Sequence, residues 1–372
     1  MKIYKLLASA FLIVGFASCQ QTLFEDLEGA SVNVVADDNV SYDGKVITVK
    51  KNCPVTFGLE GEPDVITFFS GELGHQYAYR NRTEIPLEDI VSAELKFKIW
   101  AQYGIFRTDP ENSCKNQMDV LFVTENENGE PVFPGLSRDF EADSVMLEEQ
   151  VNWQQLVERS EMPDKSTDAY NAKQIKKDLT PYIGKKMTLA FVLNRDKKVA
   201  PQNSTTPKET ILQSTFHFED ICIETKLKDN RTMIISADAF GLTPVNMKNK
   251  TKFDEHKDNE LDMPSDMEYG AVKSGVEGYW NFANLSSGNI DIAGCPANGV
   301  WKYSWLVSDY INWQLTDDVD TGIKIKEINL PMSDYTYTYS NVGTYRATFV
   351  LNNSNYEESQ QKLCEFIVNV VE

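Results

Sequence analysis

Residues 94–99 read Glu-Leu-Lys-Phe-Lys-Ile, a strict alternation of charged and apolar side chains. A period of two places the apolar side chains on one face of a β-strand and leaves the other face to water. Residues 55–59 and 364–370 alternate in the same way. Residues 187–193, Met-Thr-Leu-Ala-Phe-Val-Leu, are almost continuously apolar, which is typical of a central strand covered on both faces. These patterns predict an all-β protein of sandwich type.

A helix-like spacing of apolar residues occurs at one place, residues 149–161, and predicts a short helix there. The rest of the composition is that of an ordinary globular protein, with 372 residues, 41% of them hydrophobic and 25% charged. Lys and Arg number 36 against 56 Asp and Glu, a formal net charge of -20. This acidity argues against nucleic acid as a partner, because neutralising phosphates needs a basic face.

The N-terminus has the features of a secretory signal peptide over residues 1–18, with two lysines followed by an apolar run at residues 6–16. The run is too short to cross about 30 Å of hydrocarbon. Residues 15–19, Gly-Phe-Ala-Ser-Cys, resemble the lipobox of bacterial lipoproteins, in which the cysteine becomes the acylated N-terminus. We therefore expect lipid attachment at Cys19, a linker over residues 19–26, and contact with the membrane through this lipid only. A chance cysteine beside an ordinary cleavage site is the alternative.

The cysteines and histidines suggest neither a metal site nor a disulfide scaffold. Beyond Cys19 there are five cysteines without a CxxC pair, and the three histidines are scattered. Phosphate-binding, dinucleotide-binding, HExxH and GxSxG patterns do not occur. We expect no metal, no cofactor and no catalytic residue, and a non-enzymatic protein.

Several blocks of the chain form a set, of which the clearest is Phe-Phe-Ser-Gly-Glu-Leu-Gly-His at residues 68–75. The other blocks lie at residues 118–124, 178–193, 304–308, 320–326 and 343–349. Together, and in this order over nearly the whole mature chain, they resemble Bacteroidetes lipoproteins of the domain of unknown function 5017 family, in which the first block is a strand that ends in a tight turn. The resemblance implies a β-rich lipoprotein found near polysaccharide-uptake systems, with no established activity.

Two further resemblances concern topology. Residues 55–72 resemble the opening half of an immunoglobulin-like domain of PKD type, and residues 339–371 its closing half. Between them, residues 178–193 and 216–224 resemble the closing strands of a galactose-binding-like jelly roll. Residues 304–308 resemble an early strand of the same fold but come later in the chain, so the order is permuted. The hypothesis is therefore a split immunoglobulin-like domain, residues 27–88 plus 316–372, with a jelly roll, residues 89–315, inserted into it. Three consecutive small β domains are the alternative.

The split arrangement has a consequence for two cysteines. Cys53 shares the parity of the apolar residues 55 and 57, and Cys364 that of residues 366 and 368. If the two halves pair, both thiols point into one core. A disulfide between them is a candidate, and two buried free thiols are the favoured alternative, because free cysteine packs as a small hydrophobe.

An aromatic cluster suggests a ligand surface. Trp301 and Tyr303 alternate on one strand, with Trp280 and Trp313 nearby in the sequence. Exposed aromatic rings can stack on the C–H faces of sugars, so these four residues are candidate contacts to a glycan. Packing in or at the edge of the core is the alternative, and burial of both Trp301 and Tyr303 would end the proposal.

The acidic turn at residues 317–322 invites a calcium interpretation, but it lacks the spacing of an EF-hand loop, and an inter-strand turn is the preferred interpretation. We therefore expect a non-catalytic lipoprotein of the outer membrane that binds an extracellular ligand, with a glycan as the leading candidate and outer-membrane uptake proteins as possible partners. A structural or adhesion lipoprotein and a divergent glycoside hydrolase are the alternatives.

Overall fold

The structure is a computed structural model that describes residues 27–104, 111, 113–193, 199–200, 210–211, 213–247, 267–272, 278–294, 302–328 and 330–372. Most of these residues lie in β-strands of several sheets, as the alternating patterns predict. The only α-helix among them is α1 (Phe140–Val145). None of the helices in this part of the chain is long and apolar enough to cross a lipid bilayer.

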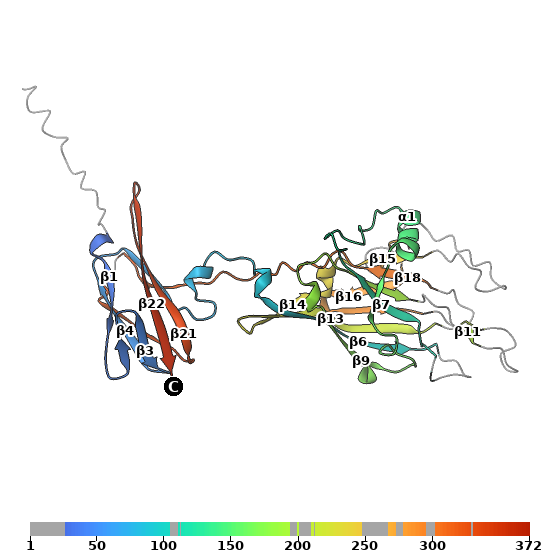
Figure 1. Ribbon diagram of the computed structural model, residues 1–372, viewed down its shortest axis with the longest axis horizontal. Helices are drawn as coiled ribbons and strands as arrows, with labels where there is room; N and C mark the ends of the chain where they lie inside the picture. The colour runs from blue at the N-terminus through green and yellow to red at the C-terminus, as the bar shows by residue number, and fades with distance from the viewer. Residues whose placement is uncertain are drawn as a thin grey trace, which may run out of the picture. The chain divides into compact units, whose positions relative to one another are not determined.

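The chain forms two compact units. Unit 1 combines the two ends of the chain, Met1–Thr83 and Asp317–Glu372, and unit 2 is Glu84–Thr316. Figure 1 shows this directly, because blue strands from the start of the chain and red strands from its end lie in the same unit. The sequence-based hypothesis places the same kind of insertion at residues 89–315.

Unit 1 contains two sheets. In the first, β4 (Pro54–Glu60) lies between β1 (Ser31–Val35) and β20 (Asp334–Thr338). The second has six strands, in the order β19 (Ile323–Lys326), β5 (Val65–Phe69), β21 (Gly343–Ser354), β22 (Ser359–Val371), β3 (Val46–Lys50) and β2 (Val40–Tyr42). All neighbours in it are antiparallel except β22 and β3, which run parallel. Both sheets join strands from the two ends of the chain.

The core of unit 1 also joins the two ends. The ring of Phe349 lies 4.8 Å from that of Phe57 and 4.7 Å from that of Phe68, measured between centroids. All three rings are fully buried in one cluster with the alternating residues of β22. A few strands from one end could not cover both faces of this core, so the two segments depend on each other.

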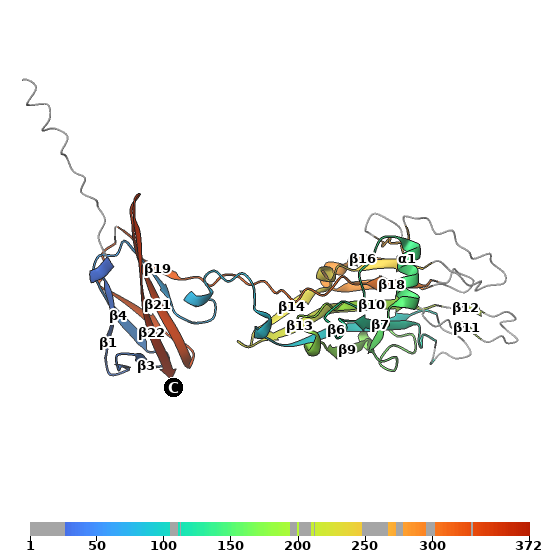
Figure 2. The same cartoon turned by 45° about the horizontal axis from the view of Figure 1, so that its top comes forward.

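Unit 2 contains two main sheets, whose long strands lie nearly along one axis in Figures 1 and 2. One has the order β16 (Trp280–Asn284), β17 (Asn289–Ile292), β13 (Thr215–Leu227), β6 (Ile90–Gln102) and β9 (Lys173–Asp178), with β14 (Thr232–Ser236) also paired to β13. The other has the order β15 (Thr243–Asn246), β18 (Ser304–Val307), β10 (Thr188–Leu193), β7 (Met118–Val123) and β8 (Gln154–Val157).

The remaining elements of the described chain are short. They comprise the strand pair β11 (Val199–Ala200) and β12 (Thr210–Ile211), a π-helix η5 (Met146–Gln150), and the 3-10 helices η1 (Leu27–Gly29), η2 (Tyr77–Tyr79), η3 (Leu87–Asp89), η6 (Ala169–Asn171), η7 (Thr180–Tyr182), η8 (Ala237–Phe240) and η10 (Leu285–Ser287).

The two large sheets of unit 2 share one core. Phe97 of β6 and Phe218 of β13 meet Phe191 of β10, with ring centroids 6.2 and 5.3 Å from the last. On its other face β10 packs against a second cluster that includes Phe140 of α1 and Trp305 of β18. Every residue of β10 is buried. The continuous apolar run therefore marks a strand covered on both faces, as the sequence predicts.

The helix expected over residues 149–161 is wrong. The helical segment consists of α1 and η5 and ends at Gln150, and residues 154–157 form β8 instead. The ladder between β8 and β7 pairs Val157 with Val120 and buries Val157 completely. Pairing along the edge of a large sheet thus overrides a local spacing that suits a helix.

One buried carboxylate holds the loop before α1. Asp143 is 1% exposed and accepts hydrogen bonds from the backbone and hydroxyl of Ser137, the backbone of Arg138 and the hydroxyl of Tyr269. Burial alone would raise the pKa of Asp143, but these hydrogen bonds outweigh it and hold the pKa below its ordinary value of 3.8. The ionised form is therefore favoured by the fold.

We predict that Asp143→Asn destabilises unit 2 in a pH-dependent way. At neutral pH the loss of charged hydrogen bonds should cost about 1–3 kcal/mol. Because the folded-state pKa is depressed, the stabilisation is complete above the ordinary pKa and is lost as the pH falls through the folded-state value. Urea unfolding of wild type and variant should therefore give curves that converge towards acid. A gap independent of pH would contradict this role.

The two chain segments that connect the units, around residues 83–85 and 315–317, pair with each other. The backbone N–H of Asp317 donates to the carbonyl of Thr83 (3.2 Å), and that of Ile85 to the carbonyl of Leu315 (2.9 Å). Between these bonds Glu84 and Thr316 form an antiparallel bridge. The insertion therefore leaves and returns at one point of unit 1, the geometry in which insertion disturbs the host least.

We predict that unit 1 folds without unit 2. Replacing residues 84–316 by a short Gly-Ser linker should give a chain with one cooperative thermal transition and strong near-ultraviolet circular dichroism. The matched control removes residues 317–372 instead, and should lose the unit 1 transition while unit 2 still unfolds cooperatively. An unfolded linker variant would contradict the claim that the two ends of the chain fold together without unit 2.

Candidate functional site

Two of the four aromatic candidates are core residues. Trp280 and Trp313 are 0% and 4% exposed, and both belong to the core shared by the large sheets of unit 2. Their indole N–H groups donate to the hydroxyl of Ser304 (2.9 Å) and the carbonyl of Lys185 (3.0 Å). With their faces packed and their polar edges satisfied, neither ring can stack on a ligand, and this part of the sequence-based prediction is wrong.

Of the other two aromatic candidates, the structure describes Tyr303 but not Trp301. Tyr303 is half-buried beside the cluster around Trp305, whose indole N–H donates to the Tyr303 hydroxyl (3.0 Å). This contact is what packing at the edge of a core requires. Trp301 lies outside the described residues, as does the lipid-attachment residue Cys19.

Cys53 and Cys364 are free thiols, so the candidate disulfide is not formed. Both are half-buried and pack against the core of unit 1, which brings the two ends of the chain together as the parity argument expects. Burial raises the pKa of the Cys364 thiol. The protonated and less reactive form is therefore favoured there.

The acidic turn supports a neighbouring loop. Asp320 is 7% exposed and accepts the backbone N–H of Gln76 (2.7 Å), and Asp317 lies 3.7 Å from Arg82. Within the described part of the chain, no group of three or more His, Cys, Asp or Glu residues is arranged to hold a metal ion. These carboxylates thus position residues 76–82.

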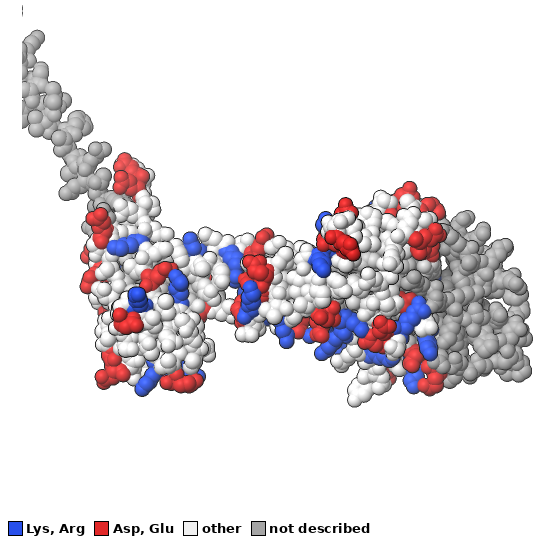
Figure 3. All heavy atoms as spheres, viewed as in Figure 1, with Lys and Arg blue, Asp and Glu red and all other residues white. Residues whose placement is uncertain are grey.

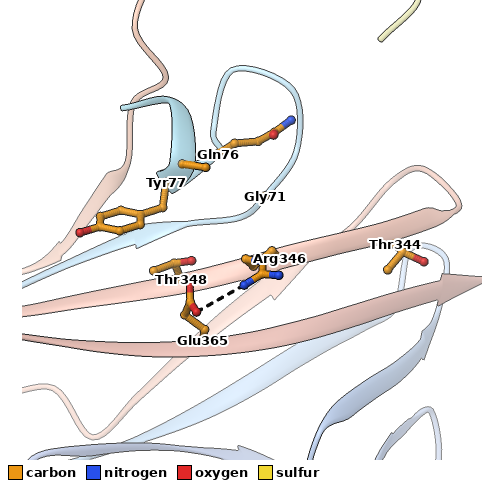
Figure 4. A pocket seen from close by; sticks show the side chains of 8 residues that line it. Gly71, Gln76, Tyr77, Thr344, Arg346, Thr348 and Glu365 are labelled. Atoms are coloured by element: carbon orange, nitrogen blue, oxygen red, sulfur yellow. Dashed lines mark hydrogen bonds and ion pairs between the residues drawn. The ribbon is translucent and has the colours of Figure 1, made fainter. Parts of the chain in front are cut away.

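That loop forms one wall of a pocket in unit 1, which sequence analysis did not find. The pocket has a volume of about 480 Å³. Its floor is the outer face of β21 and β22, the face turned away from the core, and the turn after β5 covers one side. The lining residues are Gly71, Gln76, Tyr77, Ala78, Thr344, Arg346, Thr348 and Glu365. Figure 4 shows Tyr77 on the short helix η2, and Arg346 and Glu365 pointing towards one another across the two strands.

Two glycines shape the turn. Gly71 and Gly74 have φ angles of +82° and +81°, a left-handed conformation that other residues rarely adopt. Gly71 also lies against β21, where a Cβ would be 2.5 Å from the carbonyl oxygen of Arg346. At Gly74 a Cβ would meet no atom within 4 Å. Glycine is therefore required at position 71 of the Ser-Gly-Glu motif, because the backbone of the turn touches the floor of the pocket.

Two tyrosines of the C-terminal segment fasten this turn. The Tyr337 hydroxyl donates to Glu72 (2.5 Å), and the Tyr339 hydroxyl donates to the carbonyl of Ser70 (3.0 Å). Burial raises the pKa of both hydroxyls, and the bond to Glu72 raises that of Tyr337 further. Both tyrosines therefore stay protonated and remain donors. The Ser-Gly-Glu segment was recognised in the sequence, but nothing local indicates that Tyr337 and Tyr339 contact it.

The floor of the pocket carries opposite charges in loose contact. Arg346 Nη1 lies 3.5 Å from Glu365 Oε2, and these side chains are 67% and 43% exposed. An exposed pair of this kind contributes less than ~1 kcal/mol to stability. Both groups can therefore turn towards a ligand at little cost to the fold.

The floor also holds an unsatisfied hydroxyl. Thr348 is directly opposite Glu365 in the ladder of β21 and β22 and is fully buried. Among the described residues, its Oγ1 has no hydrogen-bond partner. Buried polar groups almost always have a partner in native proteins. Four other buried side-chain atoms of the described residues also lack one, but Thr348 is the only residue of this set that lines the pocket.

Comparison with known families places the sequence. A family model described as Domain of unknown function (DUF5017) matches residues 30–237. The match covers more than half of the chain. The chain belongs to this family. No curated protein sequence matches the chain.

The DUF5017 region contains the Gly71 turn and η2, whereas β21 and β22 lie beyond its end. The wall and floor of the pocket thus come from different sides of that boundary.

We predict that Gly71→Ala and Gly74→Ala differ in their effects. Both variants force alanine into a left-handed conformation, at a cost of about 1–2 kcal/mol. Gly71→Ala adds a steric clash with β21, for which overpacking data suggest about 1–3 kcal/mol more. Urea unfolding of unit 1 should therefore show the larger loss for Gly71→Ala. Equal losses would mean that the close approach of the turn to β21 is unimportant.

Proposed function

We propose that this protein is a non-catalytic lipoprotein of the cell envelope that binds an extracellular glycan in the pocket of unit 1. Sugars present vicinal hydroxyl groups and apolar C–H faces. The pocket offers a matching set: guanidinium donors on Arg346, carboxylate acceptors on Glu365 and the ring of Tyr77. Arg80 stacks on that ring with its guanidinium carbon 3.8 Å from the centroid, and Phe69 packs edge-on against it. The ring therefore has a fixed position.

The observation that carries the proposal is the orphan hydroxyl of Thr348. An unsatisfied buried polar group costs about 1–3 kcal/mol. Thr348 is covered in this structure, so the proposal requires that ligand entry displaces the side chains over it and lets a ligand hydroxyl supply the missing hydrogen bond. Since Thr348 adjoins both charged residues of the floor, one sugar ring could contact all three.

The charge distribution supports a neutral or weakly charged ligand. The chain carries a formal net charge of -20, and basic and acidic side chains are interspersed on the face shown in Figure 3. A polyanion such as nucleic acid would be repelled overall. A glycan without many acidic groups would not.

The finer assignments belong to the same proposal. We propose an immunoglobulin-like domain of PKD type for unit 1 and a jelly roll for unit 2, because in each unit strands of different sheets contribute to one core. The N-terminal sequence supports a lipid anchor at Cys19 and an outer-membrane location. The resemblance to Bacteroidetes lipoproteins supports a role beside polysaccharide-uptake proteins.

We predict that Thr348→Val abolishes glycan binding without loss of stability. The change removes a hydroxyl that has no partner and keeps the shape, so the melting temperature should stay the same or rise. The matched control is Thr188→Val in β10, because Thr188 is also buried and its hydroxyl also lacks a partner among the described residues. This control should bind as wild type does.

The measurement is a screen of protein lacking residues 1–19 against a glycan panel, followed by calorimetry of each variant. Equal binding by wild type and Thr348→Val would contradict a role for this hydroxyl. Shortened glycan products after long incubation would identify a hydrolase instead. Binding of an envelope protein but of no glycan would support the adhesion alternative.

A further inference from the structure

A row of outward side chains extends the floor of the pocket along β22. Alternate residues of this strand face away from the core, and they are alternately polar and apolar: Gln361, Leu363, Glu365, Ile367 and Asn369. Glu365 lines the pocket. The two aliphatic side chains on either side of it, Leu363 and Ile367, are 42% and 40% exposed. We call these five residues the β22 row.

The β22 row is continuous with both sides of the pocket. At one end Gln361 accepts a hydrogen bond from the hydroxyl of Tyr77 (3.4 Å) and donates to Asn352 (3.0 Å). At the other end Asn369 accepts from Thr344 (3.4 Å). Tyr77 and Thr344 are themselves lining residues. A side-chain amide has two donors and an acceptor with two lone pairs, so both amides can bind a ligand while keeping these contacts.

The length of the row exceeds what a single sugar ring needs. Eight residue steps at about 3.3 Å separate Gln361 from Asn369, or roughly 26 Å. Along this length the strand repeats hydrogen-bonding groups and small apolar surfaces. A linear glycan has the same kind of repeat, with hydroxyl groups around each ring and C–H groups on its faces.

The charges of the pocket and of the whole protein favour a neutral glycan. The only cation and the only anion lining the pocket, within the described structure, are Arg346 and Glu365, which balance each other. An acidic polysaccharide would have to approach a protein with a formal net charge of -20. Each acidic residue of such a chain would add to the repulsion.

From these observations we infer that the ligand is an internal segment of a neutral, linear glycan that lies along β22, with one ring in the pocket and its neighbours over Leu363 and Ile367. This inference rests on the proposed glycan-binding function and adds the shape, the length and the charge of the ligand. It also predicts that binding does not require a chain end.

The test is calorimetry of the mature protein with neutral oligosaccharides of increasing length. The probes are β-1,4-linked gluco-, manno- and xylo-oligosaccharides and α-1,4-linked malto-oligosaccharides, each from monosaccharide to hexasaccharide. For the series that binds, affinity should rise at least about tenfold from monosaccharide to hexasaccharide, equivalent to about 1.4 kcal/mol. Blocking the reducing end of the hexasaccharide should leave its affinity unchanged.

Three variants separate the row from the pocket. Leu363→Ser and Ile367→Ser should lose most of the gain with length but bind the monosaccharide as wild type does. The matched control is Ile234→Ser, since Ile234 is a 53% exposed isoleucine on β14 of unit 2. It should keep the full length dependence.

Each contrary result has a distinct meaning. Equal affinity for monosaccharide and hexasaccharide, with binding still lost in Thr348→Val, would overturn the extended site and leave the proposed function standing. Tighter binding of an acidic polymer such as polygalacturonate would overturn the inferred charge. No binding of any glycan would overturn the proposed function and this inference with it, as would a peptide ligand on the same face.

Discussion

The pairing of β5 with β21 is the contact on which unit 1 depends. It places Phe69 opposite Thr348, so residues from the two ends of the chain share one ladder. The same pairing brings Phe68 against Phe349 in the core and lays the Gly71 turn on Arg346 at the surface. One set of backbone hydrogen bonds thus builds both the apolar core and the polar pocket. Whatever separates these strands would remove the candidate site together with the fold of unit 1.

Local patterns predicted the elements whose surroundings are uniform. The alternation at residues 94–99 marks β6, and the apolar run at residues 187–193 marks β10, because each has the same kind of neighbour along its whole length. The predicted helix over residues 149–161 was wrong, since pairing with β7 decided the structure of residues 154–157. Motif resemblance added what periodicity could not, namely that the first and last segments belong together.

The candidate site was less predictable than the fold. Trp280 looked like a ligand contact because aromatic residues cluster in its part of the sequence, yet its indole ring is in the core. The pocket escaped notice because its residues are individually ordinary. Thr348 and Glu365 become unusual only where β21 and β22 meet beneath the turn that carries Tyr77. Burial and register, which a single sequence does not reveal, decide which polar residues are available to a ligand.

The central claim is that a glycan lies on the outer face of β21 and β22. Methyl-labelled protein titrated with a binding oligosaccharide, observed by nuclear magnetic resonance, tests it most directly. The account predicts that the methyl signals of Thr348, Leu363 and Ile367 shift together at one dissociation constant while that of Ile234 does not move. Shifts confined to unit 2, with those three signals unchanged, would contradict it.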